Sequence, residues 1–323
     1  MSTYGLKMGQ CEMLLGSAET AADAAVLELV SLTPDYIEWQ DKQIATAFVS
    51  PFEQDVAVED RLTALLQALL QQHTALAQPQ PVYLILPEFA ADDDKQLNAT
   101  LHSIMQRMPQ ILMAPGCRVF PYGSAGALMA LNAACQYLQQ CSDADSNVWL
   151  IAVDSMAQQH LLARYAQQSS ETTVVLSEGA VALSVERGDE VFLCFHAADA
   201  LPSATQSEDT ALRALFMQLA QRAQAPLARL YLPDCGDDNQ SERWLQQYVH
   251  LHGAIDSSSQ LVFPAYFTGE LGACGGLYRL WHLLSRLQHG EFSAPVAQIE
   301  MSLRQYRAIS MLMSAKPQNK QAS

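Results

Sequence analysis

At residues 121–131 the chain reads PYGSAGALMAL, a glycine-flanked turn that leads directly into small and apolar residues. Alanine recurs beyond the turn, which predicts a slim helix in the centre of the protein. A nucleophile at the first turn of such a helix gains from the free N–H groups and the helix dipole. Ser124 holds that position, although its hydroxyl needs a base. The pattern also fits a plain strand-to-helix corner in which glycine supplies backbone freedom.

The composition indicates a globular protein. The chain has 323 residues, of which 50% are hydrophobic, so it can bury a large core. The net charge of −16 and the absence of Lys/Arg clusters argue against nucleic acid and anionic membranes as partners. No apolar run reaches the roughly 18 residues that span a bilayer. The cysteines show neither metal-ligand spacing nor a disulfide framework, so we expect reduced thiols, no metal and a cytoplasmic location.

Predicted strands and helices alternate along the chain, which is typical of an α/β fold. Helices are expected at 59–76, 92–108, 124–140, 157–167, 210–223, 240–250 and 271–288, and strands at 82–87, 111–113, 148–153, 227–232 and 260–263. The Gly188-Asp189 turn favours a hairpin between strands at 180–185 and 191–195. The polar stretch 200–209 is typical of a linker. We therefore expect two halves, 1–202 and 203–323.

Further motifs follow the Ser124 turn in a fixed order. Residues 148–155 read VWLIAVDS, residues 177–180 read SEGA, and residues 268–275 read TGELGACG. Together with Ser124-Ala125-Gly126, this order resembles the ketoacyl synthase and thiolase superfamily. In those enzymes a Cys-Ala-Gly turn opens a buried helix, a strand ends in Asp-Ser, and Ser-Glu-Gly-Ala and Gly-His-Pro-Leu-Gly-Ala-Ser-Gly come later. The resemblance covers roughly residues 82–290.

The resemblance implies a thiolase-like five-layer α/β/α/β/α sandwich of two similar halves, whose central helices begin at Ser124 and near residue 271. It places Ser124 at the position of the nucleophilic cysteine, with Gly123, Ala125 and Gly126 as the backbone of the oxyanion pocket. Gly269 falls on one expected histidine. Asp234 lies in the turn where the other histidine is expected, within the stretch LYLPDCGDD at 230–238. No cofactor is implied.

The departures from the family pattern bear on activity. Decarboxylative condensation needs a thiolate and two hydrogen-bond donors, usually histidines, and removing one such donor costs about a hundred- to a thousandfold. We therefore expect a non-condensing homologue that resembles chain-length-factor partners in fatty-acid, polyketide or aryl polyene biosynthesis. The resemblance implies a homodimer or a heterodimer with an active ketosynthase, and acyl carrier protein is a further candidate partner.

An enzyme is the alternative: a Ser124-dependent acyltransferase or thioesterase acting on carrier-protein or coenzyme A thioesters, with a His/Asp pair as activator. His196 closes a strand and is a candidate base, and Asp234 could orient one. The other histidines considered are expected at the surface or in packing: His250, His252, His282 and His289. Cys235, expected in an exposed acidic turn, and Cys274, expected in the core, are poor nucleophiles. A third possibility is a homodimeric interaction protein that kept only the fold.

Overall fold

The computed structural model describes residues 3–71, 80–89, 94–141, 146–167, 174–203 and 208–315. Within those ranges the strands form one mixed sheet in the order β10-β9-β11-β12-β8-β1-β7-β6-β4-β5, and β2 and β3 join it at β7. The strands are β1 (Tyr4–Leu15), β2 (Asp35–Trp39), β3 (Lys42–Ala47), β4 (Val82–Ile85), β5 (Arg118–Phe120), β6 (Asn147–Ser155), β7 (Leu176–Arg187), β8 (Val191–Ala200), β9 (Arg229–Tyr231), β10 (Gln260–Val262), β11 (Val296–Met301) and β12 (Tyr306–Ser314).

Helices connect these strands and cover both faces of the sheet. They are α1 (Ala21–Ala24), η1 (Leu27–Leu29), α2 (Val58–Gln71), α3 (Asp94–Arg107), α4 (Pro109–Leu112), α5 (Ala125–Gln140), α6 (Gln159–Ala166), α7 (Thr210–Arg222), α8 (Asp238–Gln247), η3 (Tyr248–Leu251), α9 (Ala265–Thr268) and α10 (Ala273–Gln288). No helix in the described ranges has the length and apolar character needed to cross a membrane.

The strands fall into two sets with the same order and direction. In the first set β1, β7 and β6 are antiparallel neighbours, and β4 and β5 continue parallel to β6. In the second set β8, β12 and β11 are antiparallel neighbours, and β9 and β10 continue parallel to β11. Strand β8 is therefore the counterpart of β1, so the second topological half begins before the boundary predicted at 202/203. Hydrogen bonding between β1 and β8 joins the two sets.

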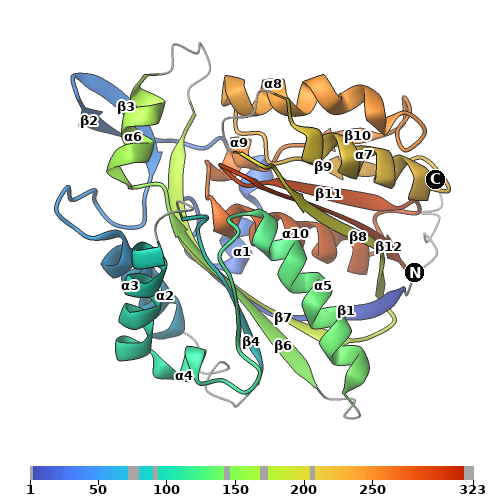
Figure 1. Ribbon diagram of the computed structural model, residues 1–323, viewed down its shortest axis with the longest axis horizontal. Coiled ribbons are helices and arrows are strands. Elements are labelled where there is room, and N and C mark those ends of the chain that lie inside the picture. The colour runs from blue at the N-terminus through green and yellow to red at the C-terminus, as the bar shows by residue number, and fades with distance from the viewer. Residues whose placement is uncertain are drawn as a thin grey trace.

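Five layers are visible in Figure 1, and the predicted α/β/α/β/α sandwich is confirmed. Helices α5 and α10 lie between the two halves of the sheet and share one buried apolar cluster. Helices α2 and α3 cover the outer face of the first half, and α7 and α8 cover that of the second. Small side chains make the close central packing possible, because Ala125, Ala127, Ala130 and Ala134 are fully buried along α5.

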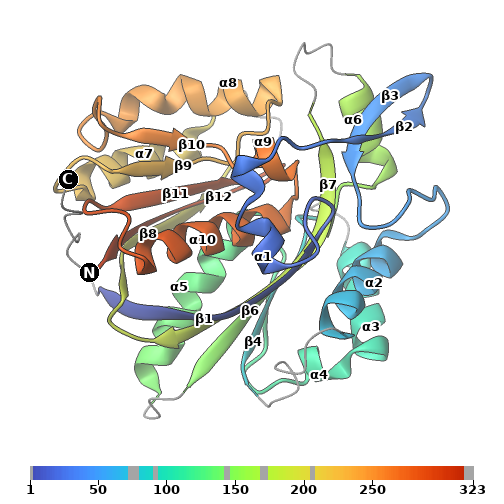
Figure 2. The same cartoon turned by 180° about the vertical axis from the view of Figure 1, so that it is seen from behind.

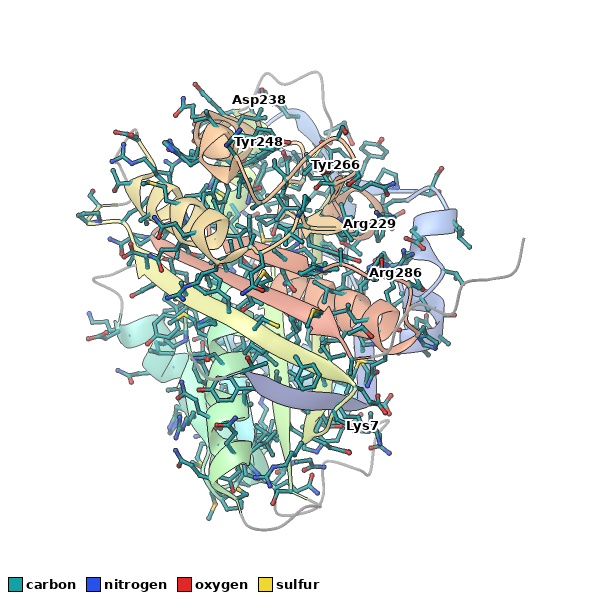
Figure 3. The ribbon with its side chains drawn as sticks, turned by 90° about the vertical axis from the view of Figure 1, so that its right-hand side faces the viewer. Lys7, Arg229, Asp238, Tyr248, Tyr266 and Arg286 are labelled. Atoms are coloured by element: carbon teal, nitrogen blue, oxygen red, sulfur yellow. The ribbon has the colours of Figure 1, made fainter. Side chains whose placement is uncertain are left out.

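The N-terminal segment that comes after β1 and contains α1 lies against the central helical layer. Seen from behind in Figure 2, α1 lies over α10, and the Tyr278 hydroxyl donates to the Ala24 carbonyl oxygen at 3.2 Å. On the outer surface of the second half, Asp238 starts α8 and Tyr248 directly follows its last residue (Figure 3).

The predicted hairpin at Gly188-Asp189 is wrong. Strand β1 lies between β7 and β8, and Leu6 of β1 is in register with both Arg187 and Val191. Glycine at 188 permits this arrangement, because a Cβ there would lie 2.6 Å from Cβ of Lys7. A turn sequence fixes the local chain reversal, but it does not fix which strand pairs with the two arms.

The strand predicted at 111–113 is also wrong. Pro109 starts the short helix α4 instead, since proline lacks the N–H that a first helical turn leaves unbonded. The strand comes later, as β5. Parts of three other predicted segments lie outside the described residues, namely 72–76, 92–93 and 204–207.

Candidate functional site

A cavity of about 310 Å³ opens where the two central helices begin. Its lining comes from both halves: Gly123 and Ser124 precede α5, Gly272 and Ala273 begin α10, and Asp154 lies near the end of β6. Ligand sites of α/β proteins commonly form at such carboxyl ends of strands. Apolar side chains complete the wall, among them Phe89, Met156, Leu161, Met301 and Leu303.

Ser124 is buried in this lining. The residue is 5% exposed, and its Oγ has no hydrogen-bond partner among the described residues. Gly123 before it has a φ of +57°, and a Cβ there would lie 2.9 Å from Cβ of Ser302, so the turn requires glycine. Gly126 donates its N–H to the Gly123 carbonyl at 3.0 Å. Of the four residues predicted for this turn, Gly123 and Ser124 line the cavity, and Ala125 and Gly126 are buried in helix packing.

Two carboxyl groups meet at the start of α10. Asp154 accepts a hydrogen bond from Ala273 N–H at 2.6 Å, and Glu270 accepts one from Gly272 N–H at 2.8 Å. Because these donors are consecutive in the chain, the two carboxyl groups lie close together. A Cβ at Gly272 would lie 2.1 Å from Oδ2 of Asp154, so only glycine allows this approach. Ionised, the pair would bring two like charges into one buried site.

Burial dominates the electrostatics of this pair. It raises the pKa of Asp154 to about 7, although the N–H groups of Ala273 and Ser155 act in the opposite direction. Burial also raises the pKa of Glu270, which the positive charge of Arg279 partly offsets. Both carboxyl groups are therefore easier to protonate than in water.

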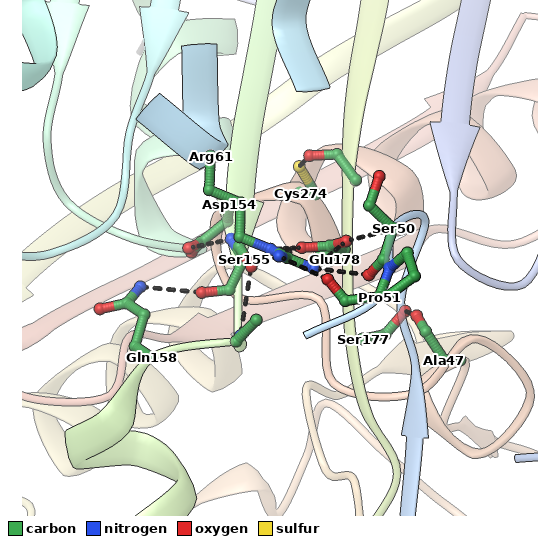
Figure 4. A network of polar contacts seen from close by, with 12 residues as sticks. Ala47, Ser50, Pro51, Arg61, Asp154, Ser155, Gln158, Ser177, Glu178 and Cys274 are labelled. Carbon is green, nitrogen blue, oxygen red and sulfur yellow. Dashed lines mark hydrogen bonds and ion pairs between the residues drawn. The ribbon is translucent and has the colours of Figure 1, made fainter. Parts of the chain in front are cut away.

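A second buried network holds the end of β6 in place, as Figure 4 shows. Arg61 of α2 donates to both carboxylate oxygens of Glu178, from Nε at 2.6 Å and from Nη2 at 2.8 Å. The Ser155 hydroxyl donates to the same carboxylate at 2.6 Å. The Asp-Ser and Ser-Glu-Gly-Ala motifs thus meet, and their contact fixes the backbone that carries Asp154.

The two positions predicted to replace histidines lie beside the lining. Gly269 has a φ of +75°, and a Cβ there would meet the Val175 carbonyl oxygen at 2.9 Å, so a side chain at 269 would point away from the cavity. The next residue, Glu270, lines the cavity instead. Asp234 accepts hydrogen bonds from Trp244 Nε1 at 2.7 Å, from Ser241 Oγ and from Gly236 N–H. These bonds anchor α8, and the neighbouring Pro233 reaches the cavity.

Among the described residues, His160 is the histidine that lines the cavity, and no sequence motif pointed to it. It lies on α6 at the mouth, where burial and the charges of Arg304 and Arg164 lower its pKa. Its position could have indicated a role in the site, because it follows the strand that ends in Asp154-Ser155, and ligand sites form at the carboxyl ends of strands.

The histidines considered as bases lie elsewhere. The ring of His196 contacts Ser310 Oγ at 3.0 Å, and that of His282 contacts the Tyr231 hydroxyl at 3.1 Å. Burial lowers the pKa of both imidazoles to about 4. His252 and His289 are exposed, and His250 is partly exposed.

One expectation about the cysteines is wrong. Cys235 was expected in an exposed turn, but it is 5% exposed, because the acidic turn folds under α8. Burial, followed by the charge of Glu270, raises the pKa of the Cys235 thiol well above its usual range. Cys274 is buried as expected, and its thiol donates to the Gly179 carbonyl at 3.0 Å. Neither thiol is ionised near neutral pH, so neither is an activated nucleophile.

No family model matches the chain, and no curated protein matches it in sequence. Solved structures do match its fold. A ketosynthase from module 6 of the bacillaene synthase of Bacillus subtilis 168 has a TM-score of 0.68 at 11% identity, over 96% of this chain and 72% of that one. The ishigamide ketosynthase/chain length factor has a TM-score of 0.65 at 12% identity, over 96% and 99%.

A third match is the ketosynthase ApeO in complex with its chain length factor ApeC from Xenorhabdus doucetiae. It has a TM-score of 0.63 at 12% identity, over 96% of this chain and 98% of the matched chain. The chain therefore has the thiolase-like fold of ketosynthases and chain length factors, as the sequence motifs predicted.

Proposed function

We propose that this protein, which has the ketosynthase fold, is a non-condensing subunit that pairs with an active ketosynthase in fatty-acid, polyketide or aryl polyene biosynthesis. The observation that carries the proposal is the state of Ser124. In the family pattern that the sequence resembles, Ser124 falls where the nucleophilic cysteine is expected. Its hydroxyl is buried and has no hydrogen bond to an imidazole among the described residues. A serine hydroxyl without a base stays protonated and is a weak nucleophile.

The groups around Ser124 also disfavour condensation. An enolate oxygen needs hydrogen-bond donors placed to receive its negative charge. Here the carboxyl groups of Asp154 and Glu270 line the cavity. When ionised, a carboxylate only accepts hydrogen bonds and repels a developing oxyanion. In their ionised form these groups therefore argue against stabilisation of the enolate.

The free edge of the sheet supports pairing with a second subunit. Strand β5 ends the strand order, so one side of it has no neighbour among the described strands. An unpaired edge is a ready site for the addition of another strand. Arg118 is exposed on β5, and Val119 and Phe120 are partly exposed. We assign this edge to the partner.

Carrier protein is the third component of the proposal. Lys7, Arg229 and Arg286 are spread apart over the face seen in Figure 3, whereas Arg164 and Arg304 both line the cavity. Of these two, Arg164 pairs with Asp237 at 2.7 Å. Arg304 is the better candidate for contact with an acidic carrier, because steering depends on exposed positive charge at the mouth.

Co-expression with the ketosynthase encoded nearby tests the pairing. Native mass spectrometry should find a one-to-one heterodimer, and a strict homodimer in the presence of that ketosynthase would count against the proposal. Arg118→Glu on β5 should weaken the heterodimer by adding negative charge to the pairing edge. Gln260→Glu places the same charge at the start of β10, the opposite edge strand, and should leave the heterodimer intact.

A serine acyltransferase or thioesterase is the second candidate. It is favoured by one observation, which is that His160 and the unbonded Ser124 hydroxyl line the same cavity. Incubation with acyl-carrier-protein or coenzyme A thioesters should then add an acyl mass to the peptide that contains Ser124. Ser124→Ala should remove that adduct and His160→Gln should slow its formation. The non-condensing proposal expects no adduct.

A further inference from the structure

With its carboxyl groups ionised, the floor of the cavity and its surroundings hold more buried negative charge than nearby cations neutralise. Asp154 and Glu270 line the cavity and Glu300 is buried nearby, each at most 5% exposed, and Arg279 is the guanidinium beside them. Arg279 forms two hydrogen bonds to Glu300, at 2.7 and 2.6 Å. Its charge is thus shared among more than one carboxyl group. Buried charges are costly unless they are paired, so Asp154 and Glu270 lack a full counter-charge.

The other charged groups of the lining lie towards the mouth. Arg164 is paired with Asp237, and Glu88 accepts hydrogen bonds from the backbone N–H groups of Arg304 and Gln305, both at 2.9 Å. Of the cations in the lining, Arg279 and Arg164 are thus each paired with a carboxylate. A ligand group that reaches the floor of the cavity would therefore lie beside hydrogen-bond acceptors, the carboxyl oxygens of Asp154 and Glu270.

Ser124 is a second, independent observation that points to a ligand site. The residue lines the cavity, and its Oγ is buried and has no hydrogen-bond partner among the described residues. A buried hydroxyl without a partner costs free energy, which a bound donor would recover. Gly276 of α10 packs on the Ser124 backbone, since a Cβ there would lie 2.2 Å from the Ser124 carbonyl oxygen. The hydroxyl is thus held at the start of α10, where the carboxyl groups lie.

We propose that this cavity binds a small organic cation with a primary ammonium head and an apolar body. An ammonium group has three N–H donors, and it would donate to the carboxylates of Asp154 and Glu270 and to Ser124 Oγ. Its carbon chain would lie against the apolar wall formed by Phe89, Met156 and Leu161. The binding site is complete within this chain, so the inference does not depend on pairing with a ketosynthase.

Two observations agree with an organic cation. Burial raises the pKa of Asp154 to about 7, so a cation bound beside this carboxyl group would favour its ionised form. Among the described residues, no group of three or more His, Cys, Asp or Glu side chains could hold a metal ion. A head group that needs only a few acceptors fits the floor better than an ion that takes six or more oxygen ligands.

Isothermal titration calorimetry of the full chain tests the charge requirement. The probes are hexylammonium, hexan-1-ol and hexanoate, which share a chain length and differ in head-group charge. Hexylammonium should bind at least about tenfold more tightly than the alcohol, and hexanoate should bind most weakly. Equal affinity for the alcohol, or the absence of hexylammonium binding, would overturn the proposal.

Matched variants test the residues. Glu270→Gln keeps the shape of the side chain and should weaken hexylammonium about tenfold or more, and Ser124→Ala should weaken it about threefold. Glu242→Gln removes an equal charge from the exposed face of α8 and should leave the affinity unchanged. Thermal unfolding identifies the folded variants. If Glu270→Gln does not fold, Ser124→Ala provides the test of the site, because this variant removes a single oxygen atom and so changes the packing least. Unchanged affinity in either folded variant contradicts the proposed site.

Discussion

Gly276 of α10 lies directly against the backbone of Ser124 at the start of α5: a Cβ on Gly276 would lie 2.2 Å from the Ser124 carbonyl oxygen. The two central helices therefore meet at a point where no side chain fits. This contact brings the halves together at the cavity, so the close packing of α5 on α10 and the shape of the site depend on the same glycine.

Gly276→Ala should destabilise the protein by about 3 kcal/mol, because the added methyl group must push the backbone of α5 away. Urea unfolding measures the loss. Gly275→Ala is the control on the same helix, since its Cβ would meet the end of a side chain, Arg279 Nη1, at 3.0 Å. Gly275→Ala should lower the free energy of unfolding clearly less than Gly276→Ala does. Equal losses for the two variants would mean that the helix contact is not the cause.

Arg61→Lys should cost about 1–3 kcal/mol of stability. Lysine keeps the charge but cannot make both buried hydrogen bonds that Arg61 donates to Glu178. Arg107→Lys is the matched control, because its ion pair with Asp60 lies at the surface and should change stability by less than about 0.5 kcal/mol. Chemical denaturation compares the two, and a loss at Arg107 as large as that at Arg61 would contradict the buried network.

Asp154→Asn should change how stability depends on pH. Burial raises the pKa of Asp154 to about 7 in the folded protein, with Glu270 and Cys274 facing it from the start of α10. Its ordinary value is about 4. The folded state therefore holds the proton more tightly. The stability that this provides is fully present below about pH 4 and is lost as the pH rises to about 7.

Relative to the wild type, the stability of Asp154→Asn should therefore rise from about pH 4 to about pH 7 and then level off. Thermal unfolding across that range checks the sign. Asp256→Asn is the control and should show no such rise across this range, because the Ser258 hydroxyl and N–H hold the pKa of the Asp256 carboxyl below its ordinary value, so its effect on stability falls below about pH 4. A difference between Asp154→Asn and the wild type that does not vary with pH would show that Asp154 is ionised as in water.

Arg304→Glu should lower the rate of carrier-protein association by about tenfold at low salt, with a smaller effect at high salt, if the mouth of the cavity receives the carrier. Stopped-flow binding measures the rate. Arg222→Glu makes the same charge reversal at an exposed position at the end of α7, outside the cavity lining, and should have little effect. A similar decrease of the association rate in both variants would show that the net charge of the protein, and not the position of Arg304 at the mouth, determines the rate.

The layers could be predicted from the sequence because they follow from local pattern and motif order. Alanines along α5 indicated a slim central helix, and the Asp-Ser and Ser-Glu-Gly-Ala motifs indicated two strands, which the structure shows as β6 and β7 and pairs with each other. The position of β1 could not be predicted. Its pairing with both β7 and β8 depends on contacts between residues far apart in the chain, which the turn at Gly188 does not encode.

The site was harder to predict, because side-chain direction depends on backbone conformation. Gly269 matched a histidine in the motif, yet its positive φ turns that position away from the cavity and brings Glu270 in. His160 lies on a separate helix that no quoted motif covers. The unbonded state of the Ser124 hydroxyl is a property of the packed structure, and no sequence pattern reports it.

Intact-mass analysis of malonyl-carrier protein after incubation with the purified chain and an acyl thioester tests the proposed function most directly. A non-condensing subunit should leave the malonyl mass unchanged, and ketoacyl product should form when an active ketosynthase is added. Loss of carbon dioxide and growth of a ketoacyl chain with this protein alone, abolished by Ser124→Ala, would contradict it.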